Sequence, residues 1–475
     1  MSTIALRTRR GSCVFLREFS RAGLHTAALC AGAVQKKRSL FFEFETRTLN
    51  KQKKADMRRL ESHDNIYKWV LLLMLWVAYF LHQGTRQIYN AVLPQIQGDF
   101  QVDSASMGFV ATSFSFTYGI TVLFAGLASD FLRRKWMIVF GVLTFCAGIF
   151  ISGFVSSIGL MMLTYGILNG LGQGCYYPPA SSLLGQHFEN MRSTAFSIHQ
   201  TAQYLGIIIC SCVAGFLGDL PSEGGYSGWR LPFFLFGGIG IIWAVVLAFV
   251  MRYSRKTHTD DGQVIKVSLK EAALVMFKKP SAVILGLVFG MNVFIDVGYK
   301  TWMPTFLHDT FGMDMAQSAV NAVLWSYIGA FIGIMLGSRI TDKLAILGRR
   351  AVRFETTMVG FLLTAPFVYI MADAASPCVC FVGLFFFGFF RGVYDSSLFA
   401  SLFDVISPRY RATGMGIMLC FGFIIGSISS TILGWMRDEF GMKYGLMTLI
   451  LCCVAAVVLL YAAKKFFFDR DYEPA

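Results

Sequence analysis

Residues 169–206 read NGLGQGCYYPPASSLLGQHFENMRSTAFSIHQTAQYLG, and this stretch decides how the whole chain is interpreted. It begins inside an apolar run, is interrupted by two consecutive prolines, passes a polar turn and enters a second apolar run. Residues 387–426, FGFFRGVYDSSLFASLFDVISPRYRATGMGIMLCFGFIIG, follow the same order, with Arg391 in the place of Gln173. The two stretches lie about half a chain apart, which indicates an internal duplication.

The composition is that of a membrane protein. Of the 475 residues, 55% are hydrophobic and only 15% are charged, whereas soluble domains carry about 25% charged residues. Many apolar runs reach the ~20 residues that a helix needs to cross a bilayer. Backbone polar groups in hydrocarbon must be satisfied within the segment, so these runs favour helices over barrel strands. We therefore expect an all-α integral membrane protein.

The apolar runs predict twelve transmembrane helices in two sets of six. They are expected at 67–93, 106–128, 136–156, 159–181, 194–217 and 230–252, then at 281–304, 316–340, 352–373, 378–402, 412–434 and 443–464. The corresponding domains are a basic N-terminal extension (1–64), a six-helix bundle (65–252), a cytosolic linker (253–279), a second six-helix bundle (280–466) and a tail (467–475). Two related bundles of this kind are typical of secondary transporters.

The net charge of +14 follows from membrane topology and does not indicate a nucleic-acid partner. Residues 1–60 contain 14 Lys or Arg and four acids, and the other positive charges cluster in short loops. Cytosolic loops carry such an excess, so both termini and the linker are expected in the cytosol, at a cell membrane. No cofactor or metal is expected, because the eleven cysteines show no zinc-ligand spacing.

The first ~60 residues have two interpretations. One is a cytosolic extension, for which Met57 offers an alternative start of the chain. The other is an organellar targeting segment, since such segments are Arg-rich and poor in acids. The second interpretation would place the protein in an organellar membrane.

Five charged residues lie deep inside predicted spans, away from the span ends, where a charge is costly and is usually functional or paired. They are the bases Arg86, Lys300 and Arg391 and the acids Asp296 and Asp395. Each acid lies four residues from a base, so two purely structural pairs are one interpretation. The other is an anion-binding site, because the sum is positive and Arg presents a planar fork that fits carboxylate or phosphate. In that site the bases bind substrate, and the acids pair or carry protons.

Other polar residues of the spans are expected at the same site. Gln173, Tyr176 and Gln203 are candidate substrate ligands, and His199 is a candidate coupling residue. A single histidine in a helix is also commonly a packed, hydrogen-bonded residue. For Arg86, the alternative is that its side chain reaches out to the membrane surface.

Residues 126–135 read GLASDFLRRK and lie between the second and third predicted spans. They resemble the GxxxDRxGRR loop motif of the major facilitator superfamily at Gly126, Asp130, Arg134 and Lys135, and a weaker copy contains Asp342. The resemblance implies that these residues gate conformational change, with a close helix approach at Gly126 and a paired acid at Asp130. The alternative is an ordinary positively charged loop.

The whole region from the first to the last span resembles the same superfamily. NGLGQGCYYPP at 169–179 is similar to the span-four signature of the organophosphate:phosphate antiporters, and WMPTFL at 302–307 to the end of their seventh span. Arg86 falls where these antiporters and the related anion:cation symporters carry a substrate-binding arginine. The resemblance implies that role for Arg86.

Departures from these families leave the substrate and the coupling open. Asp296 stands where the antiporters carry a second arginine, and Gln203 where they carry a histidine. Gln173 stands where the symporters carry an acid. The resemblance therefore implies the fold and organic-anion transport, coupled to protons or to exchange for inorganic phosphate.

We expect a monomeric secondary transporter that moves a small organic anion, such as a sugar phosphate, a sugar acid or another carboxylate, by rocking of two bundles. A neutral-solute or drug exporter is one alternative, in which all charges inside the spans form structural pairs. A non-transporting membrane sensor is another. An enzyme is not expected, because the sequence contains no nucleotide-binding motif and no catalytic constellation.

Overall fold

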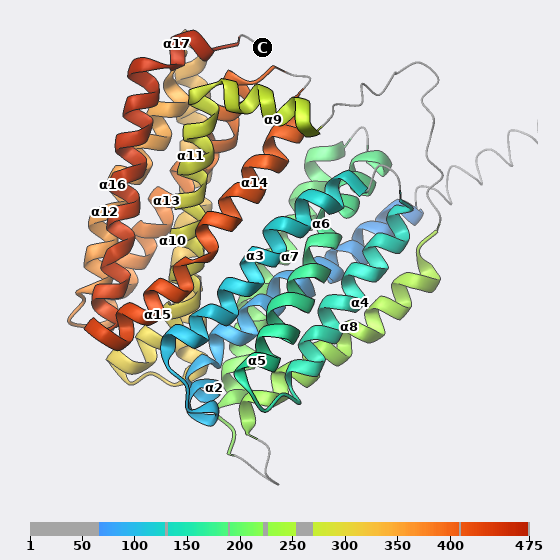
Figure 1. The fold of residues 1–475 in the computed structure, drawn as a ribbon. Coiled ribbons are helices and arrows are strands. Elements are labelled where there is room, and N and C mark those ends of the chain that lie inside the picture. Colours follow the sequence, from blue (N-terminus) through green and yellow to red (C-terminus); the bar gives the residue numbers. More distant parts are fainter. Residues whose placement is uncertain are drawn as a thin grey trace, which may run out of the picture. The chain divides into compact units, whose positions relative to one another are not determined.

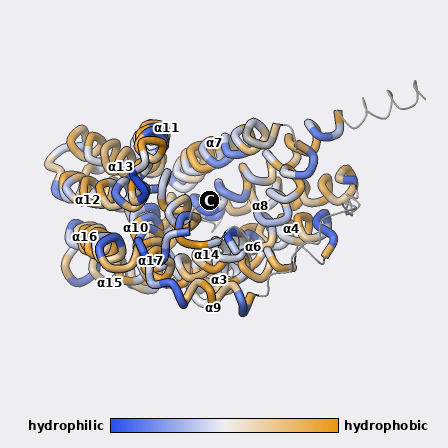
Figure 2. Tube along the Cα trace, turned by 90° about the horizontal axis from the view of Figure 1, so that it is seen from above, coloured by the Kyte–Doolittle hydropathy of each residue, from blue (hydrophilic) through white to orange (hydrophobic). Residues whose placement is uncertain are grey.

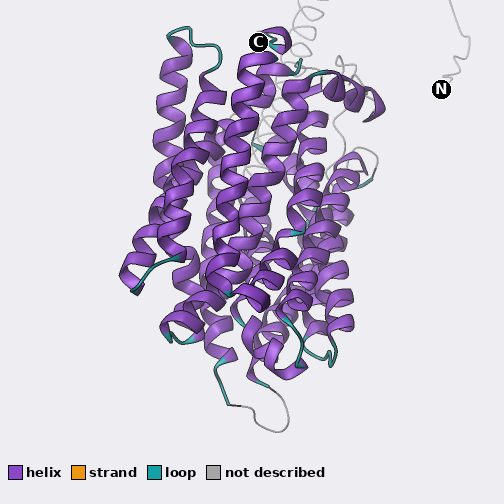
Figure 3. Ribbon diagram, turned by 60° about the vertical axis from the view of Figure 1, so that its left-hand side comes forward, coloured by secondary structure: helices purple, strands orange, loops and turns teal. Residues whose placement is uncertain are grey.

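The computed structural model describes residues 66–128, 132–188, 191–221, 227–252, 269–407 and 410–473. These residues are helical almost throughout, and no strand occurs among them (Figure 3). Residues 70–475 form one compact unit. The N-terminal extension, most of the linker and Asp130 lie outside the described residues.

The helices follow the predicted order in two sets. The first set is the helix Ile66–Ala91, α2 (Leu93–Phe100), α3 (Ser104–Ala128), α4 (Arg134–Ser152), α5 (Ile158–Met161), η1 (Met162–Leu168), α6 (Asn169–His187), α7 (Arg192–Gly218), η3 (Gly228–Arg230) and α8 (Leu231–Val250). The second set is α9 (Leu269–Lys278), α10 (Pro280–Phe311), α11 (Met315–Ile346), α12 (Val352–Ala372), α13 (Pro377–Val405), α14 (Arg411–Ser427), α15 (Ser429–Phe440), α16 (Met442–Phe466) and α17 (Phe468–Asp471). Among the described residues, 11 helices are long and apolar enough to cross a membrane.

The remaining predicted span is α5, η1 and α6, which continue one another. The backbone stays helical at both junctions, with φ −58° and ψ −43° at Met162 and φ −65° and ψ −43° at Asn169. η1 is a π-helical turn, a feature found frequently at functional sites. The prediction of an all-α membrane protein with twelve helices is confirmed.

The two prolines that interrupt the apolar run do not interrupt the helix, in agreement with the predicted span 159–181. α6 runs through Pro178 and Pro179 and ends at His187. Each proline removes one backbone hydrogen bond, but side chains can satisfy the freed carbonyls of a membrane helix. Beyond the prolines, the hydroxyl of Ser181 donates to the carbonyl of Pro178 at 2.9 Å, within the same helix.

The packing separates the two sets of helices. α4 packs against α6 and α8, and α13 packs against α11 and α12, so that the later helices gather on one side of Figure 1 and the earlier ones on the other. A Cβ on Gly388 of α13 would collide with the carbonyl of Ser326 in α11. Small residues allow membrane helices this close approach.

Apolar side chains cover the surface as well as the interior. Ile242, Phe249 and Leu451 are 66%, 85% and 69% exposed, and hydrophobic residues dominate the helices in Figure 2. A soluble domain rarely exposes contiguous apolar area on this scale. These faces are suited to lipid, and the chain is a multi-pass membrane protein.

Two carboxylates connect the sets at the end that carries α2 and α15 (Figure 1). Asp438 accepts hydrogen bonds from the backbone N–H groups of Ser104 at 2.8 Å and Ala105 at 3.2 Å, at the start of α3. Asp219 accepts one from the backbone N–H of Met315 at 3.0 Å, at the start of α11. Each acid thus caps a helix of the opposite set. We call these two contacts the end latch.

The sets move apart toward the other end of the molecule. On α3, a Cβ at Gly108 would collide with the carbonyl of Ser430, and one at Gly119 would lie 2.6 Å from the Cβ of Phe423. A Cβ at Gly126 would meet no described atom within 4 Å. The close approach expected at Gly126 is therefore not found, because α3 meets the second set through its earlier turns.

Candidate functional site

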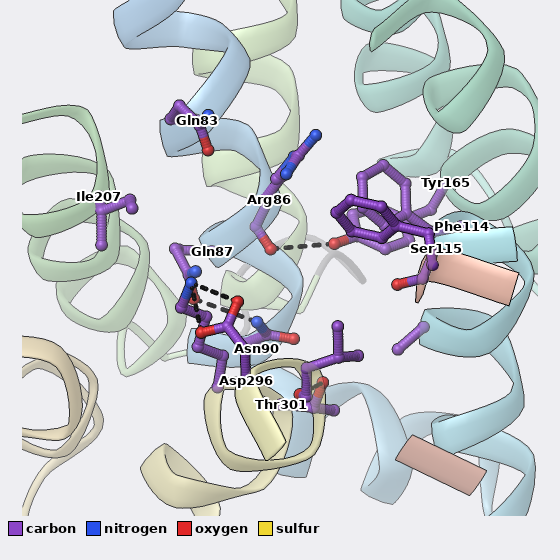
Figure 4. Close-up of a pocket in the computed structure, with 14 residues that line it drawn as sticks. Gln83, Arg86, Gln87, Asn90, Phe114, Ser115, Tyr165, Ile207, Asp296 and Thr301 are labelled. Carbon is purple, nitrogen blue, oxygen red and sulfur yellow. Dashed lines mark hydrogen bonds and ion pairs between the residues drawn. The ribbon is translucent and has the colours of Figure 1, made fainter. Parts of the chain in front are cut away.

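A cavity of about 80 Å³ lies between the two sets, near the middle of the spans. Its wall combines the helix Ile66–Ala91, α3, η1 and α7 with α10 and α14 of the second set. Its lining residues are Gln83, Arg86, Gln87, Asn90, Ala111, Phe114, Ser115, Tyr165, Ile207, Asp296, Val297, Lys300, Thr301 and Phe423 (Figure 4).

Arg86 lies inside the protein at this cavity, and its side chain does not extend to the surface. Its Nε donates to the side-chain oxygen of Gln173 at 2.5 Å. The guanidinium carbon lies 4.3 Å from the ring centroid of Tyr118 and 5.3 Å from that of Phe114, within cation–π range. Its Nη2 is buried and has no hydrogen-bond partner among the described residues. Within the same residues, no carboxylate lies within salt-bridge distance of Arg86, so this charge is uncompensated by direct contact.

The other four predicted charges form one network. Asp296 pairs with Lys300 at 2.8 Å and with Arg391 at 2.6 Å. Arg391 also lies 3.5 Å from Asp395, whose second oxygen accepts from Asn292 at 3.1 Å. The contact between Asp296 and Arg391 joins α10 to α13, so the two pairs expected within single helices are coupled. Buried pairs are costly to desolvate, and removing one member leaves an uncompensated charge.

Only part of the predicted ligand set reaches the cavity. Arg86, Lys300 and Asp296 line it, whereas Arg391 lies behind Asp296 and is not part of the wall. Gln173 is also behind the wall, and its amide nitrogen donates to Thr85 at 3.2 Å and to Asn169 at 2.9 Å. Gln173 therefore holds Arg86 in place.

Tyr176, His199 and Gln203 gather around an aromatic ring that sequence reasoning missed. The ring of Tyr79 stacks on His199 at 4.3 Å, and its hydroxyl donates to Gln203 at 3.1 Å. Tyr176 donates to the carbonyl of Leu75 at 2.7 Å and lies 3.3 Å from His199 Nε2. None of the three lines the cavity, and His199 has the surroundings of a packed, hydrogen-bonded residue.

The amides beside Arg86 were also missed. Gln83, Gln87 and Asn90 line the cavity (Figure 4), and Asn90 donates to Gln87 at 3.1 Å. Their spacing of four and three residues places them on one helix face. The run HQGTRQIYN at 82–90 carried this signal, because polar residues at helical spacing in a span indicate a face turned away from lipid.

The described loop-motif residues Gly126, Arg134, Lys135 and Asp342 do not line the cavity. Arg134 begins α4, and the ammonium of Lys135 lies 5.4 Å from the ring of Trp136. Asp342 is exposed near the end of α11. In the second copy, a Cβ on Gly337 would lie 2.9 Å from the Cα of Val393, so the close approach occurs there and within one set.

Two related sets of membrane helices that enclose a charged cavity define a membrane transporter. A sequence profile described as Major Facilitator Superfamily matches residues 75–427, and the chain belongs to that superfamily. The predicted family and transporter class are thereby confirmed.

Three known proteins illustrate the similarity. The chain is 22% identical over 394 residues to the probable anion transporter 4, chloroplastic, of Oryza sativa subsp. japonica, covering 78% of this chain and 64% of that relative, which is less than two thirds of its length. It is 23% identical over 399 residues to the hexuronate transporter of Bacillus subtilis (strain 168), covering 80% and 91%. The fold matches a bacterial homologue of the human lysosomal transporter Spinster, solved in an inward-facing and unoccupied conformation, with a TM-score of 0.78 at 19% identity over 86% of this chain and 99% of that one.

Proposed function

We propose that this protein is a secondary transporter that moves a small organic anion across a membrane by alternating access. The observation that carries the proposal is the guanidinium of Arg86, which lies at the cavity without a carboxylate partner in the described parts of the chain. An anion would supply the missing hydrogen-bond acceptor. Charge-assisted hydrogen bonds of this type are short, and a planar guanidinium binds carboxylate or phosphate in a bidentate way.

The charge balance of the wall supports an anionic substrate. Lys300 and Asp296 are paired at 2.8 Å and offset each other, which leaves Arg86 as the unbalanced charge of the lining. The neighbouring amides of Gln83, Gln87 and Asn90 both donate and accept hydrogen bonds. They are suited to hydroxyl groups, so a sugar acid or sugar phosphate fits this wall.

The names of the relatives support the same substrate class. The relative from rice is named an anion transporter and that from Bacillus subtilis a hexuronate transporter. The coupling is a proton carried by Asp296 or Asp395, or exchange for inorganic phosphate. We propose a monomer with cytosolic termini, whose two helix sets rock about the end latch while the loop-motif residues Gly126, Asp130, Arg134, Lys135 and Asp342 control the opposite end.

The test is uptake into proteoliposomes of a panel of radiolabelled phosphorylated and carboxylic anions, with and without a pH gradient or trans-phosphate. The purified wild type is compared with Arg86→Ala and with Arg349→Gln, in which an exposed arginine outside the cavity is neutralised. We expect one anion class to accumulate in the wild type and in Arg349→Gln and to be lost in Arg86→Ala. If neutral solutes accumulate instead, or if Arg86→Ala transports the anion equally well, the neutral-solute exporter replaces this proposal.

A further inference from the structure

A second and larger cavity of about 750 Å³ lies between α7 and α11. Nearly all of its wall is apolar, and the apolar lining residues include Phe196, Ile208, Leu324, Ile328, Phe331 and Met335. Both walls belong to membrane-spanning helices, and Ile328 and Phe331 are exposed. We call this cavity the lateral groove. What it faces in a membrane is the hydrocarbon of the lipid.

Two tyrosines, one from each helix set, form its inner end. The rings of Tyr204 and Tyr327 meet edge to face with centroids 5.6 Å apart, and both line the lateral groove. The hydroxyl of Tyr327 is buried and has no hydrogen-bond partner among the described residues. An unsatisfied polar group therefore belongs to a residue that lines an apolar space.

The same tyrosine connects the lateral groove with the charged cavity. The ammonium of Lys300 lies 5.6 Å from the ring centroid of Tyr327, and Lys300 lines the cavity of Arg86. One aromatic ring thus separates an apolar space that faces lipid from a small cavity with an unbalanced positive charge. This arrangement is complementary to a molecule with an anionic head and a hydrocarbon tail.

We propose that the transporter accepts amphipathic anions, with a carboxylate or phosphate head at Arg86 and Lys300 and a single alkyl chain that passes Tyr204 and Tyr327 into the lateral groove. This inference rests on the proposed anion site. The central cavity is about 80 Å³, whereas the lateral groove, at about 750 Å³, is in the ~300–1,000 Å³ range of ligand pockets. A tail can enter from the bilayer without crossing water.

The experiment measures equilibrium binding to the full chain in lipid nanodiscs, with ethyl and octyl phosphate as one matched pair and acetate and octanoate as the other. Burying one methylene is worth roughly fourfold in affinity, so we expect octyl phosphate to bind at least tenfold more tightly than ethyl phosphate. The two pairs show which head group is preferred. Arg86→Gln should weaken all four probes.

Two substitutions in the lateral groove test the path of the tail. Leu324→Trp fills the space and Ile328→Asn makes its wall polar, and both should abolish the gain from the longer chain while leaving ethyl phosphate binding unchanged. Phe249→Trp, on a lipid-exposed face of α8, is the matched control and should keep the gain. Thermal unfolding of each variant shows whether it is folded. Because two lateral-groove variants are used, the test remains informative if one of them does not fold.

Two results would overturn the inference, and they differ from failure of the proposed function. One is an equal gain from chain length in Leu324→Trp, Ile328→Asn and Phe249→Trp, which would mean partitioning into the bilayer or an annular lipid only. The other is no gain in the wild type although Arg86→Gln abolishes binding of the short anions, which would leave the anion site standing without a tail site. If Arg86→Gln changes no affinity, the proposed function itself fails.

Discussion

Arg391 forms an ion pair with Asp296, with Nη1 2.6 Å from Oδ1, and this contact joins α13 to α10. The first half repeats it with other residues, because Arg86 donates to Gln173 at 2.5 Å and joins the helix Ile66–Ala91 to α6. The sequence repeat pairs Gln173 with Arg391, and the structure gives each of them a partner on the first membrane-spanning helix of its own set. The two halves of the duplication therefore place equivalent residues in equivalent contacts at the site.

Replacing Asp296 should destabilise the protein. Asp296→Asn leaves Arg391 and Lys300 without their shared carboxylate, and breaking a buried pair in this way costs roughly 3–5 kcal/mol. The thermal unfolding midpoint in detergent should fall clearly. The double variant Asp296→Asn/Arg391→Gln should lose less than the sum of the two single variants, because both remove the same contact, although Lys300 and Asp395 still lose their partners. Independent, additive losses would contradict the coupling of these two residues.

The end latch should control the opening at its end of the molecule. Asp219→Ala and Asp438→Ala remove the caps on α11 and α3, and one cap is worth roughly 1 kcal/mol. Hydrogen exchange of the peptides that begin these helices should accelerate by about fivefold per variant, as measured by mass spectrometry. Asp373→Asn, which removes an exposed pair with Lys443 inside the second set, should leave both peptides unchanged. Equal acceleration in all three variants would rule out a specific latch.

Two glycines make a matched test of the packing. Gly388→Ala places a Cβ against the carbonyl of Ser326, and overpacking of this kind costs roughly 1–3 kcal/mol. Gly98→Ala in α2 meets no described atom within 4 Å and exchanges a poor helix former for a good one. The unfolding midpoint should fall for the first variant and be unchanged or higher for the second. The reverse order would contradict the close contact of α11 and α13.

Gln173→Glu should supply Arg86 with an internal anion. A carboxylate at that position would accept the hydrogen bond that Gln173 accepts now and would compete with the substrate for the guanidinium. We expect the affinity for the transported anion to fall at least tenfold, measured as inhibition of labelled uptake. Gln186→Glu, an exposed position near the end of α6, is the control and should not change it. Unaltered affinity in Gln173→Glu would separate Arg86 from the substrate.

The sequence predicted the helices well because their signal is local. A run of about twenty apolar residues forms a transmembrane helix in a bilayer. The helices Ser104–Ala128 and Met442–Phe466 therefore lie close to the predicted spans 106–128 and 443–464. The predicted span 159–181 contains Pro178 and Pro179, and α6 runs through both and ends six residues later, at His187.

The site was predictable only in its charges. Arg86, Lys300 and Asp296 stand out in apolar spans, and all three line the cavity. Which residues they pair with depends on how α10 packs against α13. The spacing of residues along a single helix gives no information about that packing. For the same reason Arg391 was expected in the cavity but lies behind Asp296, and the stacking of Tyr79 on His199 had no sequence signal.

The most direct test of the proposed anion site is the affinity of purified protein for its transported anion, measured by titration calorimetry for wild type, Arg86→Gln and Arg349→Gln. Binding separates the role of Arg86 in holding the anion from any role in conformational change. Removing one partner of a buried charge pair costs roughly 2–5 kcal/mol, so we expect a loss of about 30-fold or more in Arg86→Gln and wild-type affinity in Arg349→Gln. Wild-type affinity in Arg86→Gln would contradict the claim that this arginine binds the substrate.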